Sequence, residues 1–190
     1  MDTLPFMSYL QNHLLIAMPS LEDPFFERSV VYLCEHNEEG AMGLTLNVPL
    51  ELNLYDLLVQ MKLPEPGEHL KEVPVLAGGP VHNDRGFVLH SPQSGYHSSR
   101  ALSDELMITT SLDILTNLGT DAAPEQYLVT LGYAGWEAGQ LEQELLENSW
   151  LTVPASLDLL FDTPMVDLWQ AATATLGINI WQMPQQAGHA

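Results

Sequence analysis

Residues 131–151 read LGYAGWEAGQLEQELLENSWL, and this stretch predicts a strand, a glycine-rich corner, a helix and a second strand in close succession. Three glycines, Gly132, Gly135 and Gly139, bracket a tyrosine and a tryptophan, so we expect the backbone to turn sharply or to pack closely there. The stretch holds no nucleophile, metal-ligand cluster or phosphate-loop lysine. It therefore indicates a fold and no chemistry.

The helix in this stretch has an apolar stripe of Leu141 and Leu145, which lie four residues apart. Its glutamates, Glu142 and Glu144 among them, are expected to point away from that stripe. Glu137 precedes the helix and places a carboxylate where an anion would otherwise bind, so a phosphate site at this helix start is disfavoured.

The rest of the chain predicts a mixed α and β domain. Strands are expected at residues 13–18, 29–36, 41–47, 73–77, 86–90, 106–110, 127–131 and 150–153, the second and third of them forming a hairpin. Helices are expected at residues 24–28, 52–61, 112–118 and 164–176, capped in three cases by Asp23, Ser111 and Thr163. Turns or loops are expected at residues 63–69, 78–85, 91–100 and 157–162. We expect one domain over residues 1–190, with 177–190 as a loosely packed tail.

The charge of the chain is strongly one-sided. There are 25 acidic residues against five lysines and arginines, which gives a formal net charge of −20, and no lysine or arginine follows Arg100. Phosphate backbones and anionic lipids are bound through cations, so neither direct nucleic-acid binding nor a membrane surface is expected. A protein partner, in particular a basic one, is compatible with this charge.

Cys34 is the only cysteine, which excludes an intrachain disulfide and a C-x-x-C pair and suits a reducing compartment. The amino terminus lacks a cationic region followed by a long apolar run, as a signal peptide or membrane span would require. We therefore predict a cytoplasmic protein.

Cys34 and His36 lie two apart on a predicted strand, so both side chains are expected on one face, as a thiol and a base would be. A lone cysteine among apolar residues is more typical of a small buried hydrophobe, and this second interpretation is favoured.

The glycine-rich segment 78–85 carries the other polar candidates. His82, Asp84 and His90 include metal-ligand types, but their spacing matches no metal motif, and turn capping or hydrogen bonding is favoured for them. Arg85 is suited to anchoring a carboxylate or phosphate, with an ion pair to Asp84 as the favoured alternative. We name His82, Asp84 and Arg85 as candidate ligand-binding residues and assign no catalytic residue, metal or cofactor.

Two further groups have a favoured structural interpretation. Arg28 and Arg100 are also candidate anchors, with an ion pair of Arg28 to Asp23 or Glu27 as the favoured alternative. The tryptophans are expected to be core or interface anchors, and Trp181 is suited to a dimer contact, so the sequence leaves the oligomeric state open.

Four blocks of the chain, in this order, resemble the YqgE/AlgH family of small bacterial proteins. They are LLIAMPSLEDPFFERSVVYLCEHNEEGAMGLTLNVP at 14–49, GGPVHNDRGFVLH at 78–90, LMITTSLDIL at 106–115 and the stretch at 131–151. The resemblance implies a single α+β domain whose strongly bent, mixed or antiparallel sheet forms a partial barrel with flanking helices. The family carries a label, from one bacterial group, as a transcriptional regulator of alginate production, and it has no established catalytic residues. With this charge, any regulatory role is expected to act through a protein partner.

Two functional hypotheses follow. The favoured one is a non-enzymatic cytosolic binding or regulatory module, because no catalytic constellation is present in the sequence. The alternative is a small hydrolase or ligand-processing enzyme with its site in a cleft between the two glycine corners, near residues 78–85, using His82, Asp84, Arg85 and Cys34.

Overall fold

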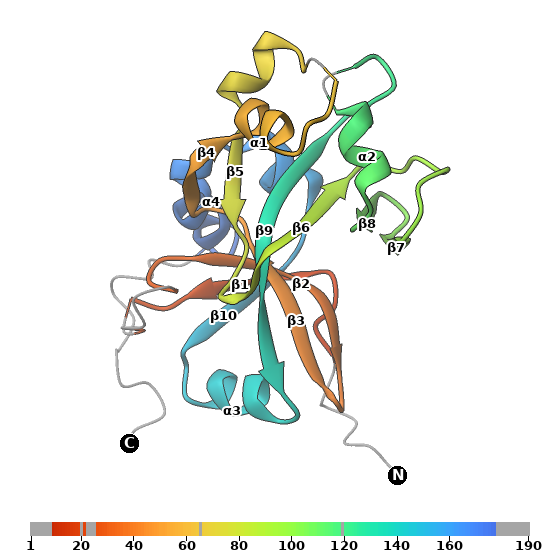
Figure 1. Cartoon of the computed structure of the whole chain (residues 1–190). Coiled ribbons are helices and arrows are strands. Elements are labelled where there is room, and N and C mark those ends of the chain that lie inside the picture. The colour runs from red at the N-terminus through yellow and green to blue at the C-terminus, as the bar shows by residue number, and fades with distance from the viewer. Residues whose placement is uncertain (1–8, 20, 22–25, 65, 119, 178–190) are drawn as a thin grey trace.

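One long strand, β9 (Tyr127–Glu137), joins the two halves of a curled ten-stranded sheet (Figure 1). The computed structural model describes residues 9–19, 21, 26–64, 66–118 and 120–177. The main path of the sheet runs β10-β1-β2-β3-β9-β6-β8-β7, and β5 joins it alongside β9. Short helices surround this half-barrel, which forms one α+β domain. The fold class that the family resemblance implied is therefore confirmed.

The remaining elements follow in chain order. The strands are β1 (His13–Ala17), β2 (Val30–Asn37), β3 (Gly40–Thr45), β4 (Pro49–Asn53), β5 (Pro74–Ala77), β6 (Val81–His90), β7 (Ser99–Ser103), β8 (Leu106–Thr109) and β10 (Trp150–Pro154). The α-helices are α1 (Leu54–Gln60), α2 (Leu112–Asn117), α3 (Gln140–Leu146) and α4 (Leu168–Ala174). Short 3₁₀ turns, η1 (Glu68–Glu72) and η3 (Met165–Asp167), and one π turn, η2 (Asp158–Asp162), complete the list. None of the helices in the described ranges combines the length and the apolar run that crossing a membrane would require.

The pairing of β9 changes along its length. Its carboxyl-terminal part, Ala134 to Glu137, pairs with β3, and its earlier residues pair with β6. It also runs parallel to β5 at Thr130 and Leu131, whereas the other strand pairs are antiparallel. Gly132, with φ of 81°, lies in the part that pairs with β6, opposite the irregularity between Val81 and Gly86. The strand therefore belongs to both halves of the sheet, and its backbone changes direction at a residue that tolerates a positive φ.

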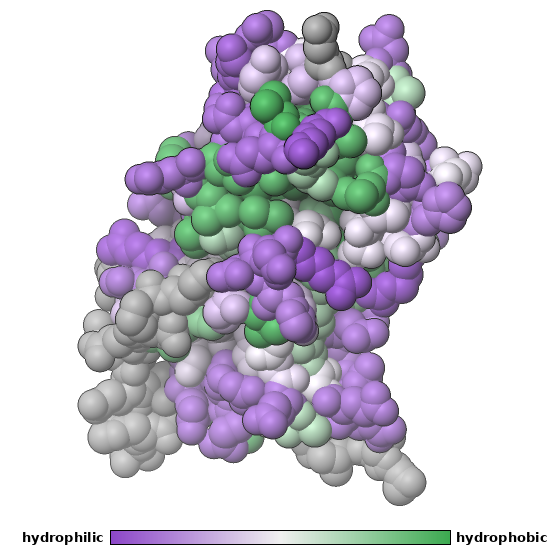
Figure 2. All heavy atoms as spheres, viewed as in Figure 1, coloured by the Kyte–Doolittle hydropathy of each residue, from purple (hydrophilic) through white to green (hydrophobic). Residues whose placement is uncertain are grey.

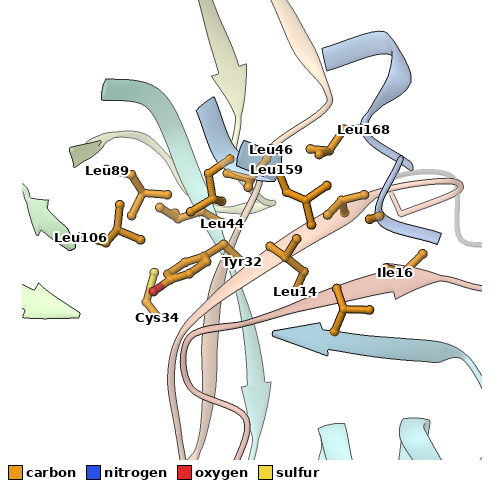
Figure 3. Packing of buried hydrophobic residues seen from close by; sticks show 14 of the residues in the cluster. Leu14, Ile16, Tyr32, Cys34, Leu44, Leu46, Leu89, Leu106, Leu159 and Leu168 are labelled. Atoms are coloured by element: carbon orange, nitrogen blue, oxygen red, sulfur yellow. The ribbon is translucent and has the colours of Figure 1, made fainter. Parts of the chain in front are cut away.

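Three hydrophobic clusters fill the fold. The largest lies inside the curl and joins β1, β2 and β3 to β6, β8 and the carboxyl-terminal helices; Tyr32, Leu44 and Leu89 belong to it (Figure 3). A second cluster packs α1 and α2 against β6 and β9. A third packs α3 against the outer face of β1, β2 and β9. Because side chains alternate along a strand, β2 contributes Tyr32 to the first cluster and Val31 to the third.

The largest correction to the sequence prediction concerns the first glycine corner. No corner forms at Gly132 or Gly135, because β9 continues through both of them to Glu137. The turn comes at Gly139, whose φ is 80° and which precedes α3. The second predicted corner is also partly strand, since β6 begins at Val81 and not at Gly86.

The sequence prediction missed two strands and one 3₁₀ turn. One missed strand is β4, which starts at Pro49, the proline expected to end the preceding strand. The other is β7, which begins in the polar segment expected to be a loop. η1 overlaps the predicted loop at residues 63–69. Backbone pairing forms both strands: β4 pairs with β5, and β7 pairs with β8. The local sequence of these segments does not predict such pairing.

Two predicted helices, at residues 52–61 and 112–118, agree with α1 and α2 to within two residues. The helix expected at 164–176 is divided into η3 and α4, and Thr163 does not cap it, because its hydroxyl donates to the carbonyl oxygen of Asp158. Ser111 is the N-cap residue of α2, as predicted, but its hydroxyl bonds to the His97 carbonyl and to Asp113 Oδ1 and makes no capping hydrogen bond. Several predicted features lie wholly or partly outside the described residues: the turn at 24–28, the cap at Asp23, Trp181 and the tail after residue 177.

Candidate functional site

The two glycine-rich segments meet backbone against backbone. A β-carbon added to Gly79 would lie 1.9 Å from the carbonyl carbon of Tyr133, and one added to Gly132 would lie 2.3 Å from the carbonyl oxygen of Gly79. Gly78 donates its N–H to the carbonyl of Leu131 and accepts a hydrogen bond from the N–H of Thr45. The glycines thus allow the connection from β5 to β6 to lie directly on β9.

The polar residues of this segment lie on a bulged part of β6. Val81 pairs with Tyr133 and Gly86 with Leu131, so the residues between Val81 and Gly86 outnumber those opposite them on β9. His82 has φ of 46°, in the left-handed region. Bulges of this kind re-aim side chains, and they occur often beside functional sites. Residues 82–85 are all exposed.

A cavity of about 360 Å³ opens next to this bulge, between α1 and α2 and over β6 and β9. Its lining is mainly aliphatic and is contributed by Leu57, Met61, Val88, Leu112, Leu115, Val129 and Leu131, with Gly86, Asp84, Arg85, Thr109, Thr110 and Ser111 completing it. Figure 2 shows apolar surface gathered over the part of the molecule where Figure 1 places β5, β6 and β9 between these two helices. The volume and lining fall within the usual range for small-molecule sites.

The three predicted ligand-binding residues are placed differently from one another. Asp84 and Arg85 both line this cavity. The ring of His82 instead lies by Tyr133, with ring centroids 5.9 Å apart, and does not line it. The ion pair expected between Arg85 and Asp84 is absent from the described part of the chain, where the guanidinium carbon of Arg85 lies 5.9 Å from the ring centroid of Phe87. The structure thus brings together two of the three candidates.

His90 belongs to a buried hydrogen-bond chain that the sequence did not reveal. Its Nδ1 lies 2.8 Å from the carbonyl oxygen of Ser91, which can only accept, so Nδ1 carries the proton. Its Nε2 lies 2.7 Å from Thr109 Oγ1 and accepts from that hydroxyl, which in turn lies 2.8 Å from Ser99 Oγ. Burial lowers the pKa of His90 from its ordinary value, which favours the neutral ring that this chain requires. Thr109 also lines the cavity, so the chain lies directly behind the cavity wall.

Cys34 and His36 point to opposite faces of the sheet, contrary to the alternation expected from their spacing. β2 has an irregularity between Leu33 and Glu35, so Cys34 is an extra residue that shifts the alternation by one position. Cys34 lies beside Tyr32 in the largest cluster (Figure 3), and burial raises the pKa of its thiol to about 12. The interpretation as a buried hydrophobe is confirmed.

His36 instead helps to attach α3 to the sheet. Its Nδ1 accepts from the backbone N–H of Leu10 at 2.9 Å, and its Nε2 lies 3.2 Å from Glu142 Oε2 on α3. Since Nδ1 is an acceptor, the ring proton is on Nε2 and is donated to the carboxylate. His36 is therefore a structural residue with both of its nitrogens occupied.

The glutamates of α3 face the sheet, and the prediction that they point elsewhere was wrong for two of them. Besides Glu142, Glu144 Oε1 accepts hydrogen bonds from the indole nitrogens of Trp136 and Trp150, both at 2.9 Å. The two rings are arranged edge to face, with centroids 6.2 Å apart. Indole N–H groups need a partner when buried, and one carboxylate oxygen satisfies both of them.

The other candidates are distributed over separate regions. The guanidinium of Arg28 lies over the ring of Trp169 at 5.5 Å, and Arg100 lies 3.8 Å from Glu35. His90 is buried, whereas His82 and Asp84 are exposed, so these three do not meet. Across the described ranges, no three His, Cys, Asp or Glu side chains are grouped as metal ligands would be.

Sequence reasoning missed the apolar lining of the cavity. The apolar residues of the two helices follow a helical pattern, and that pattern predicts only a buried face. The ones that line the cavity are Leu57 and Met61, on or just after α1, and Leu112 and Leu115 on α2. A cavity arises where two such faces leave space between them, and that depends on how the helices are placed on the sheet.

This curled antiparallel sheet, with a shared central strand and short peripheral helices, defines an α+β half-barrel protein. The chain belongs to the AlgH-like family, whose model matches residues 14–181. It is 59% identical over 186 residues to a UPF0301 protein of Shewanella woodyi, covering 97% of this chain and all of that one, and 55% identical to one of Yersinia enterocolitica, covering 95% and 99%. Among solved structures it is similar to AlgH of Pseudomonas aeruginosa, with 48% identity, full coverage of both chains and a TM-score of 0.79. A protein of Corynebacterium diphtheriae, 20% identical with a TM-score of 0.70 over the whole of this chain and 95% of that one, shares the fold.

Proposed function

We propose that this protein is a non-enzymatic cytosolic binding module, which holds a small, largely apolar molecule in the cavity between α1 and α2. The observation that carries the proposal is the cavity itself, about 360 Å³ in volume, with an aliphatic lining and a few polar groups at its rim. Aliphatic walls favour an apolar ligand body because burial removes both surfaces from water.

A binding role agrees better with the residues than the enzymatic alternative does. The residues considered for catalysis do not lie together. Cys34 is fully buried in the largest cluster, and His82 lies by Tyr133 and does not line the cavity. A catalytic site needs its nucleophile and base within hydrogen-bond reach of each other. A wider groove of about 530 Å³ lies along Glu35, Glu39 and Glu137, but it is shallow and acidic and offers less burial to a ligand.

Methyl chemical-shift mapping tests the proposal, with octanol as the probe. We expect octanol to shift the methyl signals of Leu57, Leu115 and Val129, which line the cavity, in a saturable manner. Leu146 and Val166, which are exposed elsewhere, provide the internal control for non-specific contact. Shifts that are confined to the exposed methyls, or absent altogether, contradict the proposal.

A further inference from the structure

We infer that the ligand of this cavity carries an acidic head group, bound at the rim by Arg85, on an apolar body such as that of a medium-chain carboxylic acid. The inference rests on the proposed function and adds the chemical class of the ligand to it.

Arg85 is the one cation among the residues that line the cavity, in a chain with only five lysines and arginines against 25 acids. Two of the other cations lie near carboxylates: Lys71 Nζ is 2.7 Å from Glu68 Oε2, and Arg100 is 3.8 Å from Glu35. Arg85 has no such carboxylate partner among the described residues, and its recorded contact is with the ring of Phe87. A guanidinium that remains available in so acidic a protein can bind a carboxylate through two parallel hydrogen bonds.

The backbone holds Arg85 in this position. The bulge between Val81 and Gly86 turns residues 82–85 away from regular pairing, while Gly86 and Leu131 pair again immediately after it. Arg85 is thus next to a residue fixed in the sheet, which limits the freedom of its backbone. A bulge that re-aims one side chain at a cavity mouth is a recurrent device of binding sites.

The cavity lining also offers a neutral donor. Thr110 lines the cavity, and its hydroxyl makes no hydrogen bond within the described part of the chain. Together with Arg85 it provides hydrogen-bond donors for an acid. Asp84 directly precedes Arg85 and also lines the cavity. It is the competing group, because its carboxylate favours a cationic head group. We assign the acid because Arg85 is the one cation that lines the cavity, and no carboxylate pairs with it among the described residues.

Three ligands with the same chain and different head groups test the inference: octanoate, octanol and octylamine, each titrated at pH 7 into the full-length protein. We expect octanoate to bind more tightly than the other two. We expect Arg85→Gln to weaken octanoate binding by about threefold to tenfold, which spans exposed and partly desolvated ion pairs, and to leave octanol binding unchanged. Unchanged octanol binding also shows that the variant retains the cavity. Arg100→Gln is the matched control, since it removes the same charge next to Glu35, and octanoate should bind it as it binds the wild type.

The possible outcomes distinguish failure of the acidic head group from failure of the proposed binding function. Equal affinity for octanoate and octanol, with no effect of Arg85→Gln, overturns the acidic head group and leaves the binding module in place. Tighter binding of octylamine, lost in Asp84→Asn, overturns it in favour of a cationic ligand. If none of the three binds, the proposed function itself fails.

Discussion

Gly79 and Tyr133 are in direct backbone contact, since a β-carbon on Gly79 would lie 1.9 Å from the Tyr133 carbonyl carbon. This contact holds the connection between β5 and β6 against β9, where the two halves of the sheet meet. The same connection leads into the bulge that carries Asp84 and Arg85. The position of the candidate site therefore depends on a glycine outside it.

Gly79→Ala should lower the free energy of unfolding by about 3 kcal/mol or more, because the added methyl group collides with backbone that cannot move aside as a side chain can. Gly86→Ala is the matched control in the same segment. A β-carbon there would have its nearest neighbour at 3.8 Å, an ordinary contact, so stability should stay within about 1 kcal/mol of the wild type. Equal losses in the two variants, measured by urea unfolding, would refute the proposed role of the Gly79 contact.

Glu144→Ala should destabilise the protein by about 2–3 kcal/mol, because the indole N–H groups of Trp136 and Trp150 both lose their acceptor. Glu144→Gln should lose less, since an amide oxygen can still accept from both rings. The control is Glu147→Ala at the C-cap of the same helix. Its exposed carboxylate accepts a hydrogen bond from Gln143, its one side-chain partner among the described residues, and the change should stay below about 0.5 kcal/mol. Denaturant unfolding followed by tryptophan fluorescence measures all three, and a Glu144→Ala variant as stable as Glu147→Ala would contradict the assigned role.

Stability should fall as the pH decreases from 7.5 to 5.5, in part through His90. The pKa of His90 is lowered in the folded protein, so the unfolded state binds a proton first as the pH falls through its value of about 6.5. One such group contributes at most about 1.4 kcal/mol per pH unit, in the window between the unfolded and the folded pKa. In His90→Gln this dependence should decrease. Identical pH profiles in wild type and His90→Gln would exclude the contribution of His90.

Cys34 should not react with a thiol reagent in the native protein at pH 8. Its thiol is buried, and its pKa is raised to about 12, so neither access nor the thiolate is available. In urea above the unfolding transition it should react at the rate of a free thiol. Rapid labelling under native conditions would show that β2 opens around Cys34 or that the thiol is placed differently.

The sequence predicted well those elements whose pattern is local. The β-branched run at Val30 and Val31 and the turn after it correctly predicted the β2–β3 hairpin. The spacing of Leu54 and Leu58 indicated α1, and both leucines are buried. These patterns suffice because each element buries one face, whatever the global arrangement is.

The site depended on features that arise between distant segments. Gly132 and Gly135 were expected to allow a turn or close packing. Gly132 does pack closely, but the sequence could not show that its partner is Gly79, a residue far away in the chain. One extra residue at Cys34 reversed the face of His36, because alternation along a strand does not reveal a bulge. Glu144 carries a charge typical of a solvent-facing position, and its partnership with two tryptophans becomes visible only once α3 is placed on the sheet.

The most direct test of the binding cavity is to fill it from one side of α1. Leu57→Trp adds an indole at a position that lines the cavity, and Val59→Trp adds the same group on the same helix at a position that is 49% exposed and outside it. Thermal unfolding first establishes that both variants fold. We then predict that octanol binding, measured by calorimetry, is lost or weakened at least about tenfold in Leu57→Trp and unchanged in Val59→Trp. Equal binding of octanol by the wild type and a folded Leu57→Trp variant would contradict a binding site between α1 and α2.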